Sequence, residues 1–290
     1  MANAITTFKK YTDKLDMVYQ QSAKTAVLDG DNTLVQMGAN ANEIVIPKIA
    51  MDGLADYDRN SGYVNGDVTL TNETVAFNYD RGRAFTVDAM DNEETAGVAF
   101  GRLSSEFIRT KVVPEMDAVR FAQYAGTENI STATGTLADG NAVLAALVAA
   151  QSKMDNDEVT EDNRILFITP DLYNAVHAVD TTKSREVLAS FSQIVKVPQS
   201  RFYTAIDLKD GKTEGETTGG YARASAGKDI NFMIIQKDAV IQYTKHVVNK
   251  VITPDENQSS DGWKFPYRAY GLNDVYENKV AGIYCHYKGE

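Results

Sequence analysis

The chain has 290 residues, of which 43% are hydrophobic, and a formal net charge of −11. This composition supports a folded core, which excludes an intrinsically disordered protein, and the negative charge disfavours a direct grip on nucleic-acid phosphates or anionic lipid. Cys285 is the only cysteine, so disulfides within the chain and zinc sites built on cysteine pairs are excluded. Because the sequence has neither an apolar signal segment nor a run of about 18 apolar residues, we expect a soluble protein.

Residues 1–37 are predicted to form an N-terminal arm. Apolar side chains keep a helical period there, at Phe8, Tyr11, Leu15, Val18 and Tyr19. A helix this short is marginal in water by itself, and the turn-like segment Leu28–Thr33 follows it. We therefore expect the arm to pack on the body of its own chain or on a neighbouring subunit.

Residues 38–90 are predicted to form an extended β-loop. Four segments have the alternating or β-branched character of strands, namely Glu43–Ile49, Val68–Leu70, Thr74–Tyr79 and Ala84–Val87. The intervening Gly53–Gly66 is rich in glycine and small polar residues, which is typical of a loop or a hairpin tip. A ribbon with so few core-forming residues is marginal alone, so we expect it to lie on another surface, such as the next subunit.

Residues 91–126 are predicted to form one long helix. Asp91 is a suitable N-cap, and Glu94 follows it in capping-box register. Apolar residues recur at helical spacing, at Phe100, Leu103, Phe107, Met116 and Val119. An unbroken helix of this extent would be roughly 50 Å long and would act as a strut. Pro114 should kink or split it, and Gly126 is suited to end it.

Residues 127–238 are predicted to form a mixed α/β domain. The apolar runs Ile165–Ile168 and Ile230–Ile235 have the character of buried strands. The other predicted elements are a polar segment Thr127–Gly140, a helix from Asn141 to about Met154, an acidic loop Asp155–Asp162, a helix beginning at Thr169–Asp171, a helix over about Ser184–Phe191, a strand Phe202–Leu208 and a flexible loop Lys209–Lys228.

Residues 239–290 are predicted to return to strands. These are Val240–Tyr243, His246–Ile252 and the closing segment Trp263–Tyr287, with a loop at Thr253–Gly262. Sheet at both ends of a long helix, with a mixed α/β segment between, is an α+β arrangement. The sequence therefore predicts the α+β fold class.

The search for an active site is negative. His177, His246 and His286 have no metal-binding spacing, so we interpret them as exposed or hydrogen-bonded surface residues. No nucleophile elbow, P-loop or dinucleotide-binding glycine motif occurs. We therefore predict no catalytic residue, no cofactor-binding residue, no metal ligand and no cofactor, and we expect that the protein is not an enzyme.

Three groups of side chains could still carry chemistry. The acidic group Asp155, Asp157, Glu158, Glu161 and Asp162 could bind Ca²⁺, but it lacks the EF-hand glycine and terminal glutamate, so a solvated loop is favoured. The group Asp88, Asp91, Glu93 and Glu94 could pair for acid–base work, but helix capping accounts for most of it. The C-terminal aromatic group could bind a ligand, but its alternation favours a sheet face packed on the long helix or on a neighbour. It comprises Trp263, Phe265, Tyr267, Tyr270, Tyr276, Tyr284 and Tyr287.

Three local stretches resemble one protein family. Val45–Ile49 followed by Gly53–Tyr57 is similar to the entry of its extended loop. A second stretch is similar to the return from that loop. It comprises Asp80–Arg83 with Phe85, Val87, Asp88, Met90 and Asp91. Tyr270–Leu272 with Asn278–Ile283 is similar to its closing strands. With the order of arm, loop, long helix, α/β domain and β-region, the whole chain resembles the major capsid proteins of tailed phages, which have the HK97-like fold.

The resemblance implies a major capsid protein whose copies form the hexamers and pentamers of an icosahedral phage head around double-stranded DNA. It implies an N-terminal arm at 1–37, an extended β-loop at 38–90, a spine helix at 91–126, a central (axial) domain at 127–238 and peripheral-domain strands at 239–290. The implied partners are other copies, a scaffold protein, portal and decoration proteins, and DNA enclosed without sequence-specific binding, with no membrane. The implied location is the virion, after assembly in the cytoplasm of the bacterial host.

Two features depart from some members of that family. Some join a loop lysine to an asparagine of a neighbour by an isopeptide bond. Lys48 is the only lysine between Lys24 and Lys111 and lies near the base of the predicted ribbon, so we expect no covalent cross-link, with a Lys48–Asn278 bond as the alternative. Few residues precede Phe8, so we expect a separate scaffold protein or none.

Two other functions remain open at this point. An encapsulin-like compartment shell shares the fold but encloses an enzyme cargo. A soluble hydrolase or binding protein with an unrecognised site is the alternative from another class.

Overall fold

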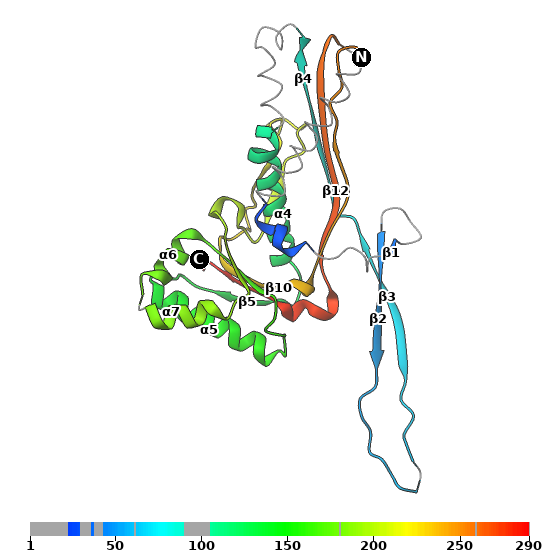
Figure 1. The fold of residues 1–290 in the computed structure, drawn as a ribbon, viewed down its shortest axis with the longest axis vertical. Coiled ribbons are helices and arrows are strands. Elements are labelled where there is room, and N and C mark those ends of the chain that lie inside the picture. The colour runs from blue at the N-terminus through cyan, green and yellow to red at the C-terminus, as the bar shows by residue number, and fades with distance from the viewer. Residues whose placement is uncertain are drawn as a thin grey trace.

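The computed structural model describes residues 23–29, 36–37, 43–60, 62–89, 105–179, 181–258 and 260–289. A body of sheet and helices lies on one side of the molecule, and two long β structures beside it extend toward opposite ends (Figure 1). One is the sheet that contains β4 and β12, and the other is the hairpin of β2 and β3. The fold is therefore α+β, as the sequence predicts.

A mixed five-stranded sheet forms the centre of the body, in the order β5-β13-β10-β6-β7. Its strands are β5 (Ser131–Thr134), β6 (Arg164–Ile168), β7 (Gln193–Lys196), β10 (Ile230–Gln236) and β13 (Ile283–Tyr287). β10 pairs antiparallel with both β13 and β6, whereas β5 and β7 pair in parallel at the two edges. Every residue of β6 is buried because both faces of this sheet are covered.

Helices cover one face of the sheet, and the long helix covers the other. The first face carries α5 (Gly140–Asn156), α6 (Pro170–His177) and α7 (Thr181–Ala189), packed on alternate strand residues such as Leu166 and Ile168. The opposite residues of the same strand, Ile165 and Phe167, pack with Phe121 and Tyr124 of α4 (Val113–Ala125). Asp139 is the N-cap of α5, and its side chain accepts a hydrogen bond from the Ala142 N–H at 2.8 Å.

The described part of the long helix runs through Pro114 without a split. Residues 105–107 are helical, Ile108–Val112 form a wider π-helical turn, and α4 follows directly. Phe107, Val112 and Val113 all keep helical dihedral angles. Proline has no amide hydrogen to donate to a helix. This loss disrupts little at Pro114, because the wide turn just before it already interrupts the regular i→i−4 hydrogen bonds. The predicted N-cap Asp91 and capping-box Glu94 lie outside the described residues, and Gly126 caps the helix with right-handed dihedral angles.

The long sheet has the order β11-β12-β4 and packs on that helix. It consists of β4 (Tyr79–Asp88), β11 (Val240–Asn249) and β12 (Gly262–Val275), all antiparallel. The ribbon is a second antiparallel sheet, with β2 (Glu43–Met51) between β1 (Gln36–Met37) and β3 (Val68–Ala76). The strands predicted around residues 43–49 and 68–79 are thus present, with the predicted tip between them.

Five local expectations need correction. Residues 131–134 form β5 within a segment predicted to be polar loop, and the segment predicted as strand at 202–208 has only β8 (Ile206–Leu208). The loop expected at 209–228 contains β9 (Tyr221–Arg223), which pairs with β8. β7 was not predicted. β13 lies in the central sheet, so its assignment to the peripheral strands of residues 239–290 is wrong.

Short 3-10 helices complete the described fold. They are η1 (Lys24–Leu28), η4 (Gln199–Arg201), η5 (Lys237–Ala239) and η6 (Glu277–Gly282). η1 comes from the predicted arm and packs into the core through fully buried Leu28. This part of the arm therefore lies on its own chain.

Candidate assembly surfaces

The base of the ribbon packs on its own chain through one face. Strand pairing sets Ile44 opposite Val75, and both side chains are buried against Ile241 of β11 and Leu272 of β12. Side chains on a strand alternate between the two faces, so the same face continues along β2 through the even-numbered residues. This contact anchors the ribbon to the long sheet.

The opposite face of the ribbon is apolar and exposed toward its tip. The cross-strand pairs Ile49–Leu70 and Met51–Val68 share this face. Each of the four side chains is between 60% and 72% exposed. Apolar side chains gathered on one face of a projecting hairpin mark a surface that another protein covers.

The tip of the ribbon adds further apolar and acidic groups. Leu54 is fully exposed, and the rings of Tyr57 and Tyr63 are 4.9 Å apart across the tip. Four aspartates accompany them, at Asp52, Asp56, Asp58 and Asp67. The tip can therefore offer both apolar contacts and negative charge to a partner.

Lys48 lies between two glutamates at the base of the ribbon. Its Nζ is 2.9 Å from Oε2 of Glu73 on β3 and forms a shorter ion pair with Glu277 of η6. The hydrogen bond to Glu277, followed by that to Glu73, raises the pKa of the Lys48 ammonium. A protonated amine is not a nucleophile, so this arrangement favours a salt bridge over amide-bond formation. Glu277 immediately precedes Asn278, so the structure places Lys48 close to that segment of its own chain.

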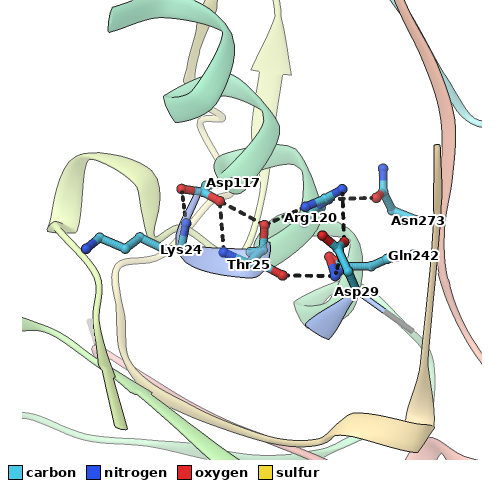
Figure 2. Close-up of polar contacts among 7 residues, drawn as sticks. All are labelled: Lys24, Thr25, Asp29, Asp117, Arg120, Gln242 and Asn273. Atoms are coloured by element: carbon cyan, nitrogen blue, oxygen red, sulfur yellow. Dashed lines mark hydrogen bonds and ion pairs between the residues drawn. The ribbon is translucent and has the colours of Figure 1, made fainter. Parts of the chain in front are cut away.

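A buried polar junction ties η1 to the long helix. Figure 2 shows Asp117 of α4 facing the start of η1. Asp117 is fully buried and accepts the backbone N–H groups of Lys24 and Thr25, each at 3.1 Å, and the Thr25 hydroxyl at 2.8 Å. Arg201 of η4 donates to the same carboxylate at 3.1 Å. The Asp117 carboxylate therefore joins η1 and η4 to the long helix through hydrogen bonds inside the core.

Arg120 extends the junction from α4 to the long sheet. It is 3% exposed, and it donates to the Thr25 hydroxyl at 2.8 Å and to the side-chain oxygen of Asn273 on β12 at 2.9 Å (Figure 2). Gln242 of β11 donates to the Thr25 carbonyl at 3.0 Å. The junction thus joins five separated segments, namely η1, α4, η4, β11 and β12, and its burial gives it a structural role.

This junction was not among the sites predicted from the sequence. A usable signal was present, because Asp117 and Arg120 stand one helical turn apart among the apolar residues Met116 and Phe121. Charged residues in the apolar stripe of a helix need buried partners. The partners come from residues 24–29, 201, 242 and 273, which no local pattern connects.

The three histidines do not converge. His177, at the end of α6, is exposed and packs edge-on against Tyr173 at 4.4 Å between ring centroids. His246, in β11, is exposed. His286, in β13, is buried, contrary to the surface position expected for it, and its Nδ1 lies 3.0 Å from the amide nitrogen of Asn231. Burial lowers the pKa of His286.

The acidic group at 155–162 forms local ion pairs. Arg164 donates to Asp155 at 2.6 Å and to the Thr160 carbonyl at 2.9 Å, while Lys153 pairs with Asp157. Across the described residues, no group of three or more His, Cys, Asp or Glu side chains is arranged to hold a metal ion. Of the second acidic group, Asp88 ends β4, whereas residues 91, 93 and 94 lie outside the described part.

The C-terminal aromatic group is largely a packed sheet face. Phe265 and Tyr267 of β12 are buried against the long helix, where Phe107 lies 5.9 Å from the Tyr267 ring. For these residues the interpretation of packing on the strut is confirmed, whereas Tyr284 and Tyr287 lie in β13 of the central sheet. Within the described part of the chain, no helix is long and apolar enough to cross a bilayer.

Comparison with known proteins gives structural matches only. The sequence matches no protein-family model and no curated protein. A chain from Gordonia phage Cozz matches with a TM-score of 0.60 at 10% identity, over 93% of this chain and 87% of that one. The capsid structure of the Cyanophage P-SCSP1u matches with a TM-score of 0.55 at 12% identity, over 88% of this chain and 86% of that one.

A virus-like particle from Pyrococcus furiosus also matches, with a TM-score of 0.58 at 11% identity, over 96% of this chain and 98% of that one. Structural matches at sequence identities this low show a shared fold alone. The shared region includes nearly the whole of each chain.

Proposed function

We propose that this chain, which has the HK97-like capsid fold, is a major capsid protein of a phage. Its copies would form the hexamers and pentamers of an icosahedral head that encloses double-stranded DNA. In this role the protein is structural and catalyses no reaction. Fold alone does not determine function, so the proposal also draws support from the exposed apolar face of the ribbon.

The observation that carries the proposal is that the ribbon is buried on its own chain through one face and exposed on the other. Its base is buried on its own chain through Ile44 and Val75, while the opposite face presents Ile49, Met51, Val68 and Leu70 to solvent. Fully burying one such side chain contributes about 1.5–3 kcal/mol. A monomer gains nothing from these four groups, whereas a shell subunit buries them against the next copy.

The segments have proposed roles in the shell. Residues 1–37 form the arm and residues 38–78 the extended loop, while β4 belongs to the long sheet rather than to that loop. Residues 91–126 form the spine helix of the peripheral domain. The region 127–238, together with β13, forms the central domain near the capsomer centre, and the rest of 239–290 completes the peripheral domain. The net charge of −11 supports enclosure of DNA without a tight grip on it. Scaffold, portal and decoration proteins are the further proposed partners, in a host cytoplasm and then in the virion.

A compartment shell is a second candidate function. The match to the virus-like particle from Pyrococcus furiosus over 96% of this chain and 98% of that chain supports it. Such an encapsulin-like shell would enclose protein cargo in place of DNA. The two candidates share the ribbon contact and differ in particle size and contents.

Negative-stain microscopy of the purified protein, alongside its sedimentation coefficient, tests the proposal. Closed particles, or rings of five and six copies, are the expected result. Particle diameter and the nucleic-acid or protein content of particles from the host separate a phage head from a compartment. A compact monomer that never assembles, with or without co-expressed candidate scaffold proteins, would contradict both candidates.

A further inference from the structure

The tip of the ribbon contains the only asparagine in the chain that is followed directly by a glycine, Asn65 before Gly66. The tip joins β2 to β3 and projects away from the body of the molecule (Figure 1). Both residues are exposed, and the backbone of residues 63–67 has no regular secondary structure. Exposed loop tips are the parts of a folded chain that are most open to water and to chemical change.

Hydrogen bonds hold the chain beside this pair of residues but do not hold the pair itself. The Asp52 N–H donates to the Asp67 carbonyl at 3.2 Å, and the Asp52 carboxylate accepts the Asp67 N–H at 2.8 Å. These bonds end the paired part of the ribbon immediately beside Gly66. Within the described part of the chain, nothing forms a hydrogen bond with the Asn65 side chain or with the Gly66 N–H. The two groups can therefore approach each other without first giving up a partner.

We propose that Asn65 is a site of spontaneous covalent modification, at which the backbone nitrogen of Gly66 displaces the side-chain amide group of Asn65. After a base removes the Gly66 amide proton, the nitrogen forms a bond to Cγ of Asn65, as a nucleophile held close by the chain itself. The Cγ–Nδ2 bond breaks, and the departing nitrogen takes up a proton and leaves as ammonia. The product is a succinimide ring, which water opens at one of its two carbonyls to give aspartate or isoaspartate at position 65. The reaction needs only water and base.

Glycine at position 66 favours this ring closure. It has no Cβ to crowd the attacking nitrogen, and its backbone reaches conformations that other residues avoid. The packing of the folded chain does not require it, however, because a Cβ built on Gly66 would lie 3.5 Å from the Cβ of Asp52, an ordinary contact distance. Alanine therefore fits the folded tip and obstructs only the reaction.

The loop between β8 and β9 contains a comparable pair, Asp210 before Gly211, in which hydrogen bonds oppose the same ring closure. The Asp210 carboxylate accepts the Thr213 hydroxyl at 2.6 Å and the N–H groups of Lys212 and Thr213 at 2.7 and 2.8 Å. These hydrogen bonds lower the pKa of Asp210 to about 2 and keep the carboxylate charged. A charged carboxylate held in this way repels a nucleophile, whereas the neutral amide of Asn65 has no such protection.

The modification changes the ribbon tip in two ways. Residues 52–67 contain four aspartates and the single cation Arg59, a net charge of −3, which one further carboxylate changes to −4. Isoaspartate also adds a methylene group to the main chain, because the backbone then runs through the former side chain. Since the reaction needs no partner, each chain accumulates the change with the time that has passed since its synthesis. The state of position 65 therefore records the age of a subunit.

Timed incubation of the purified full chain, followed by trypsin digestion and mass spectrometry, tests the proposal. Trypsin cuts before Asn60 and after Arg81, so Asn65, Asn72 and Asn78 are released in one peptide, residues 60–81. Position 65 should convert to aspartate and isoaspartate, faster at higher pH because base takes part. Asn72 in β3 and Asn78, which donates to a backbone carbonyl at 2.7 Å, are internal controls and should keep their amides. A zero-time sample corrects for reaction during digestion.

Gly66→Ala is the matched control variant. It should lower the rate of conversion at position 65 about tenfold, equivalent to a barrier increase of about 1.4 kcal/mol. Its urea unfolding midpoint should equal that of the unaltered chain, because the added methyl group makes only an ordinary contact. An isoaspartate methyltransferase with labelled S-adenosylmethionine gives a second readout. It should label the aged unaltered chain, and it should label neither the fresh chain nor the aged Gly66→Ala chain.

Three results would overturn the modification site. The first is a folded chain that keeps the Asn65 amide while the excised peptide loses it, because the tip would then protect the residue. The second is equal conversion in the unaltered and Gly66→Ala chains, which would exclude the Gly66 nitrogen as the nucleophile. The third is equal conversion at Asn65, Asn72 and Asn78. All measurements use unassembled subunits, so they do not depend on whether the copies form a shell.

Discussion

Asp117 on the long helix accepts both the backbone N–H and the hydroxyl of Thr25, which lies 92 residues earlier in the chain. Arg120, one turn along the same helix, donates to that hydroxyl from the other side. The two residues fix the first described segment of the chain on the helix that also supports the long sheet. Because Arg120 also donates to Asn273 of β12, the junction holds the first described segment, the long helix and the long sheet together.

The Asp117→Ala substitution should destabilise the unassembled subunit by about 3–5 kcal/mol, because it leaves Arg201 and two backbone donors without their buried acceptor. Thr25→Val removes only the hydroxyl and should cost less, about 1–3 kcal/mol. Urea unfolding followed by circular dichroism measures both. An Asp117→Ala variant within about 0.5 kcal/mol of the unaltered chain would refute the structural role of the junction.

Arg81 should control the order of the loop between β8 and β9. It pairs with Glu115 at 2.8 Å and donates to the carbonyls of Lys209 and Gly220 at 2.8 and 3.3 Å. In Arg81→Met these contacts are lost, so trypsin should cut after Lys212 faster than in the unaltered chain. Arg268→Met, which breaks the exposed pair with Asp80 on the neighbouring strand and the contact of the guanidinium with the Tyr270 ring, is the control. Equal cleavage rates in both variants would be evidence that the Arg81 contacts do not order this loop.

Cys285 should be unreactive in the folded protein. Burial raises the pKa of its thiol from 9.0 to about 12. At pH 8 this leaves about a thousandfold less thiolate than a free thiol has, and the thiolate is the reactive form. A chromogenic thiol reagent should therefore label one group per chain only after unfolding in urea. Rapid stoichiometric labelling of the native chain would show that β13 is accessible.

His286 should make the folded chain less stable at mildly acidic pH. Burial lowers its pKa below the ordinary value of 6.5. Below pH 6.5 the unfolded chain therefore binds the proton more readily than the folded chain does, and the free energy of unfolding falls as the pH approaches the folded-state pKa. His286→Gln should show a smaller stability loss between pH 7 and pH 5, measured by urea unfolding. The exposed His177→Gln should keep the full loss, and the same slope in both variants would contradict this account.

The elements with strong local periodicity could be predicted from the sequence. The apolar run Ile165–Ile168 becomes a strand buried on both faces, and the spacing of Val143, Leu147 and Met154 becomes one buried side of α5. The ribbon was also predictable, because two alternating segments flank a tip rich in glycine. In each of these elements the local pattern and the final packing agree.

The errors arise where distant pairing decides the structure. β5 contains only Ser, Thr and Ala and is a strand because its neighbour β13 offers a free edge. β13 follows β12 in the chain, yet the 3-10 helix at Glu277–Gly282 carries it into the other sheet. Pro114 leaves the helix continuous because a π-helical turn precedes it. None of these facts has a local sequence signal.

Of the candidate surfaces, too, one part could be predicted from the sequence and another part could not. An exposed ribbon that needs a partner was predictable from its shortage of core residues. The difference between its buried face and its exposed face was not predictable, because it depends on the register that pairs Ile49 with Leu70 and Ile44 with Val75.

Sedimentation velocity of an Ile49→Ser/Leu70→Ser chain tests the central claim most directly. These side chains are exposed in the subunit, so its unfolding free energy should stay within about 0.5 kcal/mol. Their loss at an interface should cost about 3 kcal/mol or more, which raises the concentration needed for assembly about a hundredfold. Ala50→Ser/Thr69→Ser, a cross-strand pair on the opposite face, is the matched control. We predict that the first variant sediments as unassembled subunits and that the control variant sediments as particles. Normal particles from the first variant would contradict the claim that this face joins the copies.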